Sequence, residues 1–319
     1  MLYPGTFQCY AYIKMASFER GTVVVLTHNR RVQLLQTLRA LSRLPDGWPV
    51  IVVDNGSTDG TAEAVTREFP NMLLIRSRRN IGAAARNIGV AYVHTPYVAF
   101  CDDDTQWQAG SLERAGRILD QHPQIGVLNG RVMVGEAGRV DPTCTTMACS
   151  PLDRENLPGP QLLGFMAGAC IVRTRAFYEA GGYWPPLFIG GEEELLALDL
   201  AERGWRMVYV EDVVTHHFPS RLRNGTLRQR LLLRNAIWVA WMRLPLRQAW
   251  RETLALLRSA SRRNLLRDVV VLTIGGMLRV LRERHVVPAR VAAMRALLWG
   301  QAAAEAADVQ AQRTRRSMA

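Results

Sequence analysis

Lysine is almost absent from this 319-residue chain: Lys14 is the only one, so nearly all of the 40 basic side chains are arginine. Guanidinium groups suit phosphate binding, although genome base composition can produce the same bias. A net positive charge is also lacking over most of the chain. Residues 221–319 carry a net charge of +15, whereas residues 1–220 carry −3. A near-neutral domain followed by a strongly basic region is therefore predicted.

Paired cysteines and long apolar runs are also lacking. The five cysteines form no C-x-x-C pair, which argues against a zinc site or a disulfide framework and for a reducing compartment. The first 14 residues have no apolar core typical of a signal peptide, and Met15 is a candidate start. The longest apolar stretch, Val269–Leu281, is broken by Arg279 and two glycines, so no transmembrane span is predicted. We expect a cytoplasmic protein, with peripheral attachment to the inner face of the cell membrane left open.

Short apolar runs, each followed by a polar turn and a helical pattern, organise the first hundred residues. We expect strands at Thr22–Leu26, Val50–Val53, Met72–Ile75 and from Tyr97 to Cys101. Alternating strands and helices predict an α/β fold with a mostly parallel sheet. Thr27, Asp54 and Asp102 each follow a strand, and ligands bind at this edge of such sheets. We therefore expect these three residues to line one site.

The later part of the chain is less regular. Residues 136–160 are expected to form loops, and Val208–Val210 and Val213–Val214 two short strands. The predicted organisation is an N-terminal extension, a catalytic domain, a basic helical region and a frayed polar tail, at residues 1–20, 21–220, 221–300 and 301–319. The extension is either disordered or the product of a mistaken start.

Acidic side chains occur in two groups that bear on chemistry. Asp102–Asp104 follow a buried strand, where three like charges need solvent, protonation or a cation. They form either a solvated turn or a site for Mg²⁺ or Mn²⁺, for which carboxylates and an imidazole such as His216 or His217 are suitable ligands. Glu192–Glu194 either stabilise a helix N-terminus or supply a general base.

Several short motifs occur in a fixed order between Thr22 and His217. They are Thr27-His28-Asn29-Arg30, Val53 to Thr61, Asn80-Ile81-Gly82, Asp102-Asp103-Asp104 and Gly191-Glu192-Glu193. Each motif is weak alone, but the ordered series resembles family 2 glycosyltransferases of the GT-A fold, in particular rhamnosyl- and galactofuranosyltransferases.

This resemblance implies a role for each matching residue. Asp102 and Asp104 would hold the metal with His216, and His217 is an alternative ligand. Glu193 stands where the family often has an Asp as general base, which leaves Glu192 as an alternative base. The residues expected to bind the nucleotide-sugar are Thr27, Asn29, Arg30, Asp54, Asn55, Asn80, Gly82, Arg86, Asp102 and Asp103.

The implied reaction is inverting transfer of a sugar from a UDP-, dTDP- or GDP-linked donor to a hydroxyl of a saccharide or lipid-linked acceptor. A sugar-phosphate nucleotidyltransferase is the alternative enzyme, but the turn at Thr27–Arg31 lacks the glycines expected for it. A basic nucleic-acid-binding protein is the alternative from another class, and it leaves the acidic cluster unexplained. We expect no nucleic acid partner.

Leucine, tryptophan and arginine are interleaved in the basic region after Thr226. Three interpretations remain: a helical subdomain packed on the catalytic domain, a surface that docks on an anionic membrane, or a nucleic-acid-binding region. The sequence does not indicate an oligomeric state.

Overall fold

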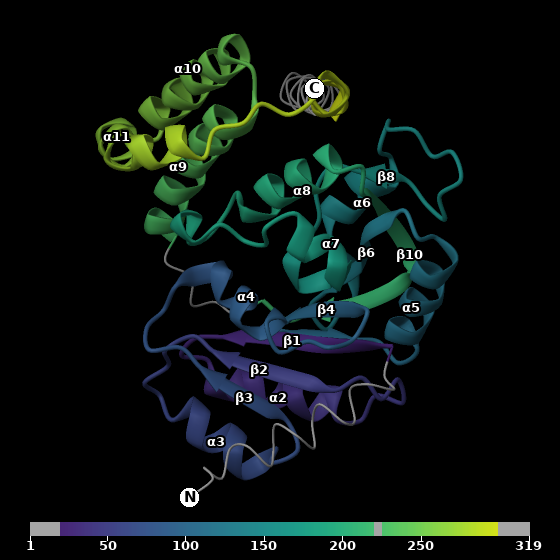
Figure 1. The fold of residues 1–319 in the computed structure, drawn as a ribbon. Helices are drawn as coiled ribbons and strands as arrows, with labels where there is room; N and C mark the ends of the chain where they lie inside the picture. Colours follow the sequence, from purple (N-terminus) through teal and green to yellow (C-terminus); the bar gives the residue numbers. More distant parts are fainter. Residues whose placement is uncertain (1–19, 220–224, 299–319) are drawn as a thin grey trace, which may run out of the picture.

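The computed structural model describes residues 20–219 and 225–298 (Figure 1). The predicted N-terminal extension lies outside these ranges except for residue 20, and the predicted polar tail, residues 301–319, lies wholly outside them. The proposed boundary between catalytic domain and basic region, near residue 220, also falls outside the described residues.

One sheet forms the centre of the catalytic domain, and it contains ten strands within the described residues. The strands are β1 (Gly21–Thr27), β2 (Val50–Asp54), β3 (Leu73–Arg76), β4 (Tyr97–Asp102), β5 (Thr105–Trp107), β6 (Ile125–Val134), β7 (Arg139–Val140), β8 (Gln161–Leu162), β9 (Cys170–Arg173) and β10 (Arg206–His217). The main order is β3-β2-β1-β4-β9-β6-β10-β5. Neighbours from β3 to β4 pair in parallel, whereas β9 pairs antiparallel with both β4 and β6. The predicted α/β architecture is confirmed. The sheet is mixed rather than mostly parallel, because β10 pairs in parallel with β6 but β5, β7, β8 and β9 pair antiparallel with their neighbours.

Helices cover both faces of the sheet and continue beyond it as a separate group (Figure 1). The α-helices are α2 (Arg31–Leu41), α3 (Thr61–Glu68), α4 (Ala85–Val90), α5 (Ser111–Gln121), α6 (Pro142–Ala148), α7 (Thr174–Glu179), α8 (Glu192–Glu202), α9 (Gly225–Arg243), α10 (Leu246–Arg262) and α11 (Leu266–Arg282). Short 3₁₀ turns occur at η1 (Gly82–Ala84), η2 (Ala167–Ala169) and η3 (Pro185–Leu187).

The apolar core has two layers, one on each face of the sheet, and successive side chains of the central strands point alternately into them. In β1, Val24 contributes to the layer covered by α4, α7 and α8, whereas Val23 and Val25 contribute to the layer under α2, α3 and α5. All three valines are buried. Because successive side chains of a strand point to opposite faces, a β-branched run buried on both sides is what a central strand requires.

The register of the parallel strands brings the predicted site residues to one edge. Thr27 pairs with Asp54 across β1 and β2, and Leu26 pairs with Asp102 across β1 and β4. The polar residues that follow these strands therefore share the carboxyl edge of the sheet, as the sequence predicts.

Two local expectations differ from the structure. The two short strands predicted at Val208–Val214 are one strand, β10, in which a bulge lies between Val210 and Val214. The segment 136–160, predicted as loops, contains β7 and the short helix α6, whose N-terminus is capped by the Asp141 carboxylate.

The basic region forms a helical bundle. Helices α9, α10 and α11 pack against one another around Leu233, Ile237, Ala260, Leu265 and Val269. The contacts between α8 and α9 join this bundle to the catalytic domain. Among residues 20–219 and 225–298, no helix combines the length and the apolar character needed to cross a bilayer.

Candidate active site

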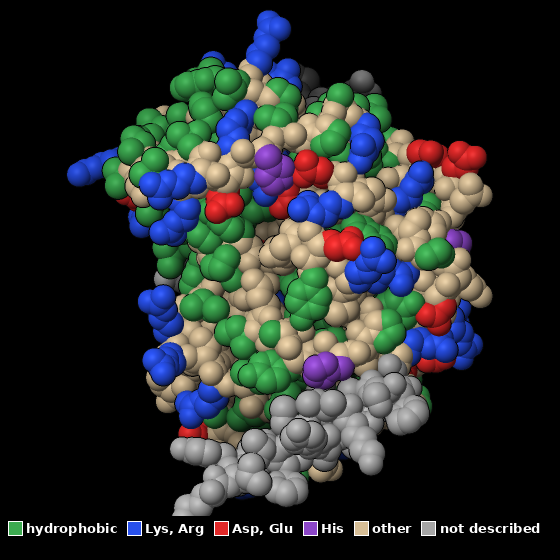
Figure 2. Space-filling view, in the orientation of Figure 1, with side chains coloured by type: hydrophobic (Ala, Val, Ile, Leu, Met, Phe, Trp, Pro, Cys, Tyr) green, Lys and Arg blue, Asp and Glu red, His purple; other side chains and the backbone are tan. Residues whose placement is uncertain are grey.

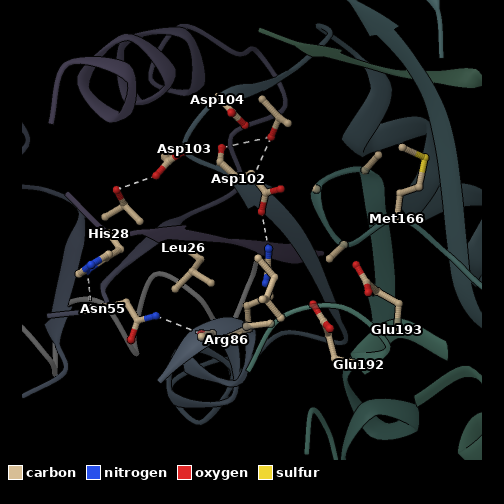
Figure 3. A pocket seen from close by; sticks show the side chains of 18 of the residues that line it. Leu26, His28, Asn55, Arg86, Asp102, Asp103, Asp104, Met166, Glu192 and Glu193 are labelled. Carbon is tan, nitrogen blue, oxygen red and sulfur yellow. Dashed lines mark hydrogen bonds and ion pairs between the residues drawn. The ribbon is translucent and has the colours of Figure 1, made fainter. Parts of the chain in front are cut away.

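A cavity of about 770 Å³ lies at the carboxyl ends of β1 and β4. The turns after β1, β2 and β4 line one part of it, and the first turn of α8 lines another. Figure 3 shows Arg86 extending toward Asp102, with Glu192 and Glu193 on the neighbouring wall. Helix α9 adds Leu227 and Arg228, so residues from both the central sheet and the helical bundle of the basic region form this cavity.

The acidic turn after β4 is held by the turn after β1. The Thr27 hydroxyl donates to Asp103 at 2.9 Å, and Arg30 Nη1 contacts Asp103 at 2.9 Å and Asp104 at 2.7 Å. Burial raises the pKa of Asp103 to about 6, and Asp104 adds to this effect while Arg30 opposes it. Burial also acts on Asp104, but hydrogen bonds from His217 and Arg30 outweigh it and lower the pKa. Asp104 is thus the better candidate for a permanently ionised ligand.

Arg86, at the start of α4, pairs with one acidic group and feels the charge of the other, Glu192 and Glu193. Its guanidinium pairs with Asp102 and lies about 6 Å from the ring centres of Phe100 and Tyr183. Burial opposes the charge of Arg86, but Asp102 together with Tyr183, Glu193 and Glu192 outweighs burial and raises the pKa of Arg86 above the usual arginine value. Arg86 therefore remains a fixed positive charge in the cavity.

Glu192 and Glu193 occupy the first turn of α8. Gly190 and Gly191 precede them with φ of +81° and +84°, a conformation that glycine adopts readily and that turns the chain into the helix. Burial and the adjacent Glu192 charge raise the pKa of Glu193 to about 8. Burial also raises the pKa of Glu192, which is only 6% exposed and whose Oε2 has no hydrogen-bond partner among the described residues.

Two of the predicted nucleotide-binding residues, Asn80 and Gly82, contact the amide of a third, Asn55. Its Nδ2 donates to Asn80 and to the Gly82 carbonyl at 3.0 Å each, and its Oδ1 accepts from the backbone of Ile81 at 2.9 Å. Gly82 has a φ of +67°, and a side chain there would collide with the carbonyl of Phe188. This turn therefore requires glycine.

Three predicted site residues do not line the cavity. Asp54 is buried and accepts from the Ser57 backbone at 2.8 Å, and Asn29 braces the same loop through the Thr58 backbone at 2.8 Å. His216 is also absent from the lining. The structure instead places His217 there, with Nε2 3.5 Å from Asp104 Oδ1.

Sequence reasoning missed several residues of the cavity. His28 lies within a quoted motif, and its Nδ1 is 3.0 Å from the Asn55 carbonyl oxygen. The others are mostly apolar: Phe165, Met166, Phe188, Ile189, Leu227 and Leu231. Apolar residues give no chemical signal in a sequence, so only the fold could reveal that they share a cavity with the acidic residues.

The donor groups at the acidic turn fit a divalent cation in their chemistry. Asp102, Asp104 and His217 supply two carboxylates and an imidazole, and the Asp102 side chain is 40% exposed. In the described residues, the trio whose ligand atoms lie within 4.8 Å of one another is a different one, Asp199, Glu202 and His285. Arg243 already contacts both oxygens of Asp199, at 2.5 and 2.9 Å, so this second cluster is an ion-pair network.

A family model agrees with this combination of fold and site. The model described as glycosyl transferase family 2 matches residues 22–181, which is half of the chain. The chain belongs to glycosyl transferase family 2. Family membership confirms the resemblance that the sequence indicates and favours this glycosyltransferase assignment over the nucleotidyltransferase alternative.

Two curated relatives of this glycosyltransferase come from Mycobacterium tuberculosis. An N-acetylglucosaminyl-diphospho-decaprenol L-rhamnosyltransferase is 27% identical over 291 residues, covering 76% of this chain and 94% of the relative. A pre-mycofactocin glycosyltransferase is 29% identical over 217 residues, covering 65% of this chain and 45% of the relative.

Solved structures show the same GT-A fold. TarS 1-349 from S. aureus, in complex with UDP-GlcNAc, has a TM-score of 0.60 at 20% identity, with 86% of this glycosyltransferase and 83% of that chain covered. The mannosyltransferase PcManGT from Pyrobaculum calidifontis, in complex with GDP-Man and Mn²⁺, has a TM-score of 0.56 at 19% identity, with 93% and 94% covered.

Proposed function

We propose that this glycosyltransferase moves a sugar from a nucleoside diphosphate-sugar to a hydroxyl of a lipid-linked saccharide, with metal assistance and inversion at the anomeric carbon. One observation carries the proposal. A single cavity contains an acidic turn suited to a metal-bound diphosphate and, on another wall, a glutamate whose pKa is raised to about 8.

Glu193 is the proposed general base. It takes the proton of the acceptor hydroxyl as the acceptor oxygen bonds to the anomeric carbon, while the bond to the diphosphate oxygen breaks. The nucleoside diphosphate leaves with the electron pair, so one displacement inverts the configuration. A base is more effective when its pKa lies near the working pH, which suits Glu193 better than an exposed carboxylate. Glu192 raises this pKa through its charge.

Asp102, Asp104 and His217 are the residues that would hold Mg²⁺ or Mn²⁺. Such a cation supplies charge neutralisation for the leaving diphosphate. His217 replaces His216 in this proposal because it lines the cavity beside Asp104. Arg86 adds a fixed positive charge close to Asp102.

The nucleotide is proposed to bind the turns after β1, β2 and β3. Thr27, Arg30, Asn55, Asn80 and Gly82 line this part of the cavity. Asp54 and Asn29 act by holding the loop at Ser57 and Thr58 in place.

The acceptor is proposed to enter between η3 and α9, where Phe188, Ile189, Leu227 and Leu231 give the cavity an apolar wall. The rhamnosyltransferase relative takes, by its name, a saccharide on a diphospho-decaprenol, which is the acceptor class considered for this chain. An apolar wall next to the base suits an acceptor that carries a lipid.

Substitution of each glutamate separately tests the assignment of the base. Glu193→Gln should reduce sugar transfer by at least about a thousandfold and leave donor affinity within about twofold, because only the proton acceptor is removed. Glu192→Gln is the matched control in the same helical turn and should keep much of the activity. Near-normal transfer by Glu193→Gln would contradict this assignment.

The donor class can be identified by thermal shift. UDP-, dTDP- and GDP-sugars are compared with and without Mn²⁺, since a ligand that binds only the folded chain raises the melting temperature. Stabilisation by one nucleotide that depends on the metal is expected. If no nucleotide stabilises the protein under either condition, the proposed donor site is wrong.

A further inference from the structure

Helix α11 presents an unusual outer surface. Val271, Ile274, Leu278 and Leu281 recur at helical spacing and are exposed, Ile274 by 69% and Leu278 by 66%. The opposite side of the helix, with Val269, packs into the bundle core. A water-exposed helix normally carries polar residues at such positions, so this apolar row indicates an interaction surface.

Helix α10 repeats the pattern with more charge. Leu246, Trp250 and Leu254 are exposed at four-residue spacing, and the inner side of the helix is buried through Ala249 and Ala260. Arginine accompanies this row at positions 247, 251, 258 and 262, and none of these four makes an ion pair with a described residue. Apolar rings and aliphatic side chains therefore alternate with free guanidinium groups on one helix surface.

We define the outer face as the exposed side chains of α10 and α11. Figure 2 shows them at the upper left, where hydrophobic and basic side chains are mixed. Residues 246–282 contain eight arginines and two acids. Both acids are already paired, Glu252 with Arg295 and Asp268 with Arg230. The outer face is thus basic as well as apolar.

These two properties together select one kind of partner. A second copy of the outer face would bring like charges together, and a nucleic acid would leave the leucines and isoleucine in water. An anionic bilayer satisfies both properties, because apolar side chains and Trp enter the interface while arginines contact lipid headgroups. We propose that the outer face of α10 and α11 docks this glycosyltransferase on the surface of an anionic lipid bilayer.

Docking is connected to the cavity through α9. This helix packs against α10 and α11 and also contributes Leu227, Arg228 and Leu231 to the cavity wall. A bundle that rests on the bilayer therefore extends directly to the wall proposed for a lipid-linked acceptor. The docking argument itself stands on the outer face alone and does not depend on the identity of that acceptor.

Vesicle co-sedimentation of the full chain tests the proposal. Vesicles of phosphatidylcholine alone are compared with vesicles that also contain phosphatidylglycerol. We expect binding to the anionic vesicles that weakens with added salt. Arg247→Gln/Arg251→Gln/Arg258→Gln should weaken binding by about a hundredfold, since each arginine near such a surface contributes roughly fivefold. Ile274→Ser/Leu278→Ser should weaken it by about tenfold or more.

Matched controls are on the catalytic domain. Val32→Ser and Arg67→Gln remove an exposed apolar and an exposed basic side chain there, and both should bind vesicles like the unchanged chain. Circular dichroism checks that each variant is folded. If Ile274→Ser/Leu278→Ser unfolds, the triple arginine variant still tests docking, because its three changes are at exposed positions.

Three outcomes would overturn docking: no sedimentation with anionic vesicles, equal binding by the outer-face variants and the unchanged chain, or dissociation of a dimer by Ile274→Ser/Leu278→Ser. Sugar transfer to a water-soluble acceptor, which needs no membrane, tests the proposed function independently of docking. The outer-face variants should retain that transfer. Vesicle binding by a chain that transfers no sugar would support docking and count against the proposed function.

Discussion

At the scale of single residues, the proton of Glu193 should control the pH dependence of transfer. The pKa of Glu193 is raised to about 8, and only its ionised form can accept a proton from the acceptor. Below this pH the protonated, inactive form increases, so kcat/KM should fall by about tenfold per pH unit on the acid side. Activity should level off above pH about 8.

Glu192→Gln provides the internal check on this prediction. After burial, the charge of Glu192 is the largest contribution that raises the pKa of Glu193. Removing that charge should move the acid limb of the kcat/KM profile to lower pH. A limb that stays in place would show that another group controls the profile.

Single residues also mark the limit of what the sequence could predict. Asp102–Asp104 and Glu193 could be located because each follows a strand or begins a helix at a point that local patterns define. The choice between His216 and His217 could not be made in this way. Across the bulge of β10, the chain advances four residues, Val210 to Val214, while β6 advances one, Gly130 to Arg131. This insertion changes which side chains face the cavity and leaves no local signature.

At the scale of elements, buried Arg295 holds helix α8 against the bundle. It donates to Glu194 of α8 at 2.8 and 3.0 Å and to Glu252 of α10 at 3.0 Å. Arg295→Met should lower the free energy of unfolding by about 3–5 kcal/mol, because Glu252 is left as a buried charge without its main partner. Urea denaturation measures this change.

A second substitution separates charge from packing. Arg295→Met/Glu252→Gln should recover part of the lost stability, since the unpaired charge is gone. Arg290→Gln, in the same segment, removes a partly exposed contact with the Glu202 carbonyl at 2.8 Å and should cost less than about 1 kcal/mol. Equal losses in Arg295→Met and Arg290→Gln would argue against a structural role for the buried network.

The elements differ in how far the sequence predicted them. The strands β1, β2 and β4 were predicted because buried β-branched runs are a local signal. The pairing of Glu194 with Arg295 joins residues about a hundred positions apart and depends on how the bundle packs on α8. Charge composition indicated a basic region but could not show which arginines would be buried in such pairs.

At the scale of the whole molecule, the cavity belongs to both the sheet and the bundle, so donor and acceptor binding should be separable. Arg228 on α9 is exposed, lines the cavity and lowers the pKa of Glu192 by its charge, although burial has the larger, opposite effect. Arg228→Gln should raise KM for an acceptor that carries a diphosphate by about tenfold and leave the donor Kd unchanged.

The matched control for Arg228→Gln is Arg67→Gln on α3, which removes a similarly exposed guanidinium away from the cavity lining. Steady-state kinetics with varied acceptor, together with titration of the donor, measures the two effects separately. In the proposed arrangement, the sheet edge binds the nucleotide and α9 contacts the acceptor. An unchanged acceptor KM in Arg228→Gln, or a donor Kd that rises as much as the acceptor KM, would contradict it. The predicted split follows because α9 and the turns proposed to bind the nucleotide approach the cavity from different parts of the fold. Removing one charge from α9 therefore leaves the contacts among Asn55, Asn80 and Gly82 intact.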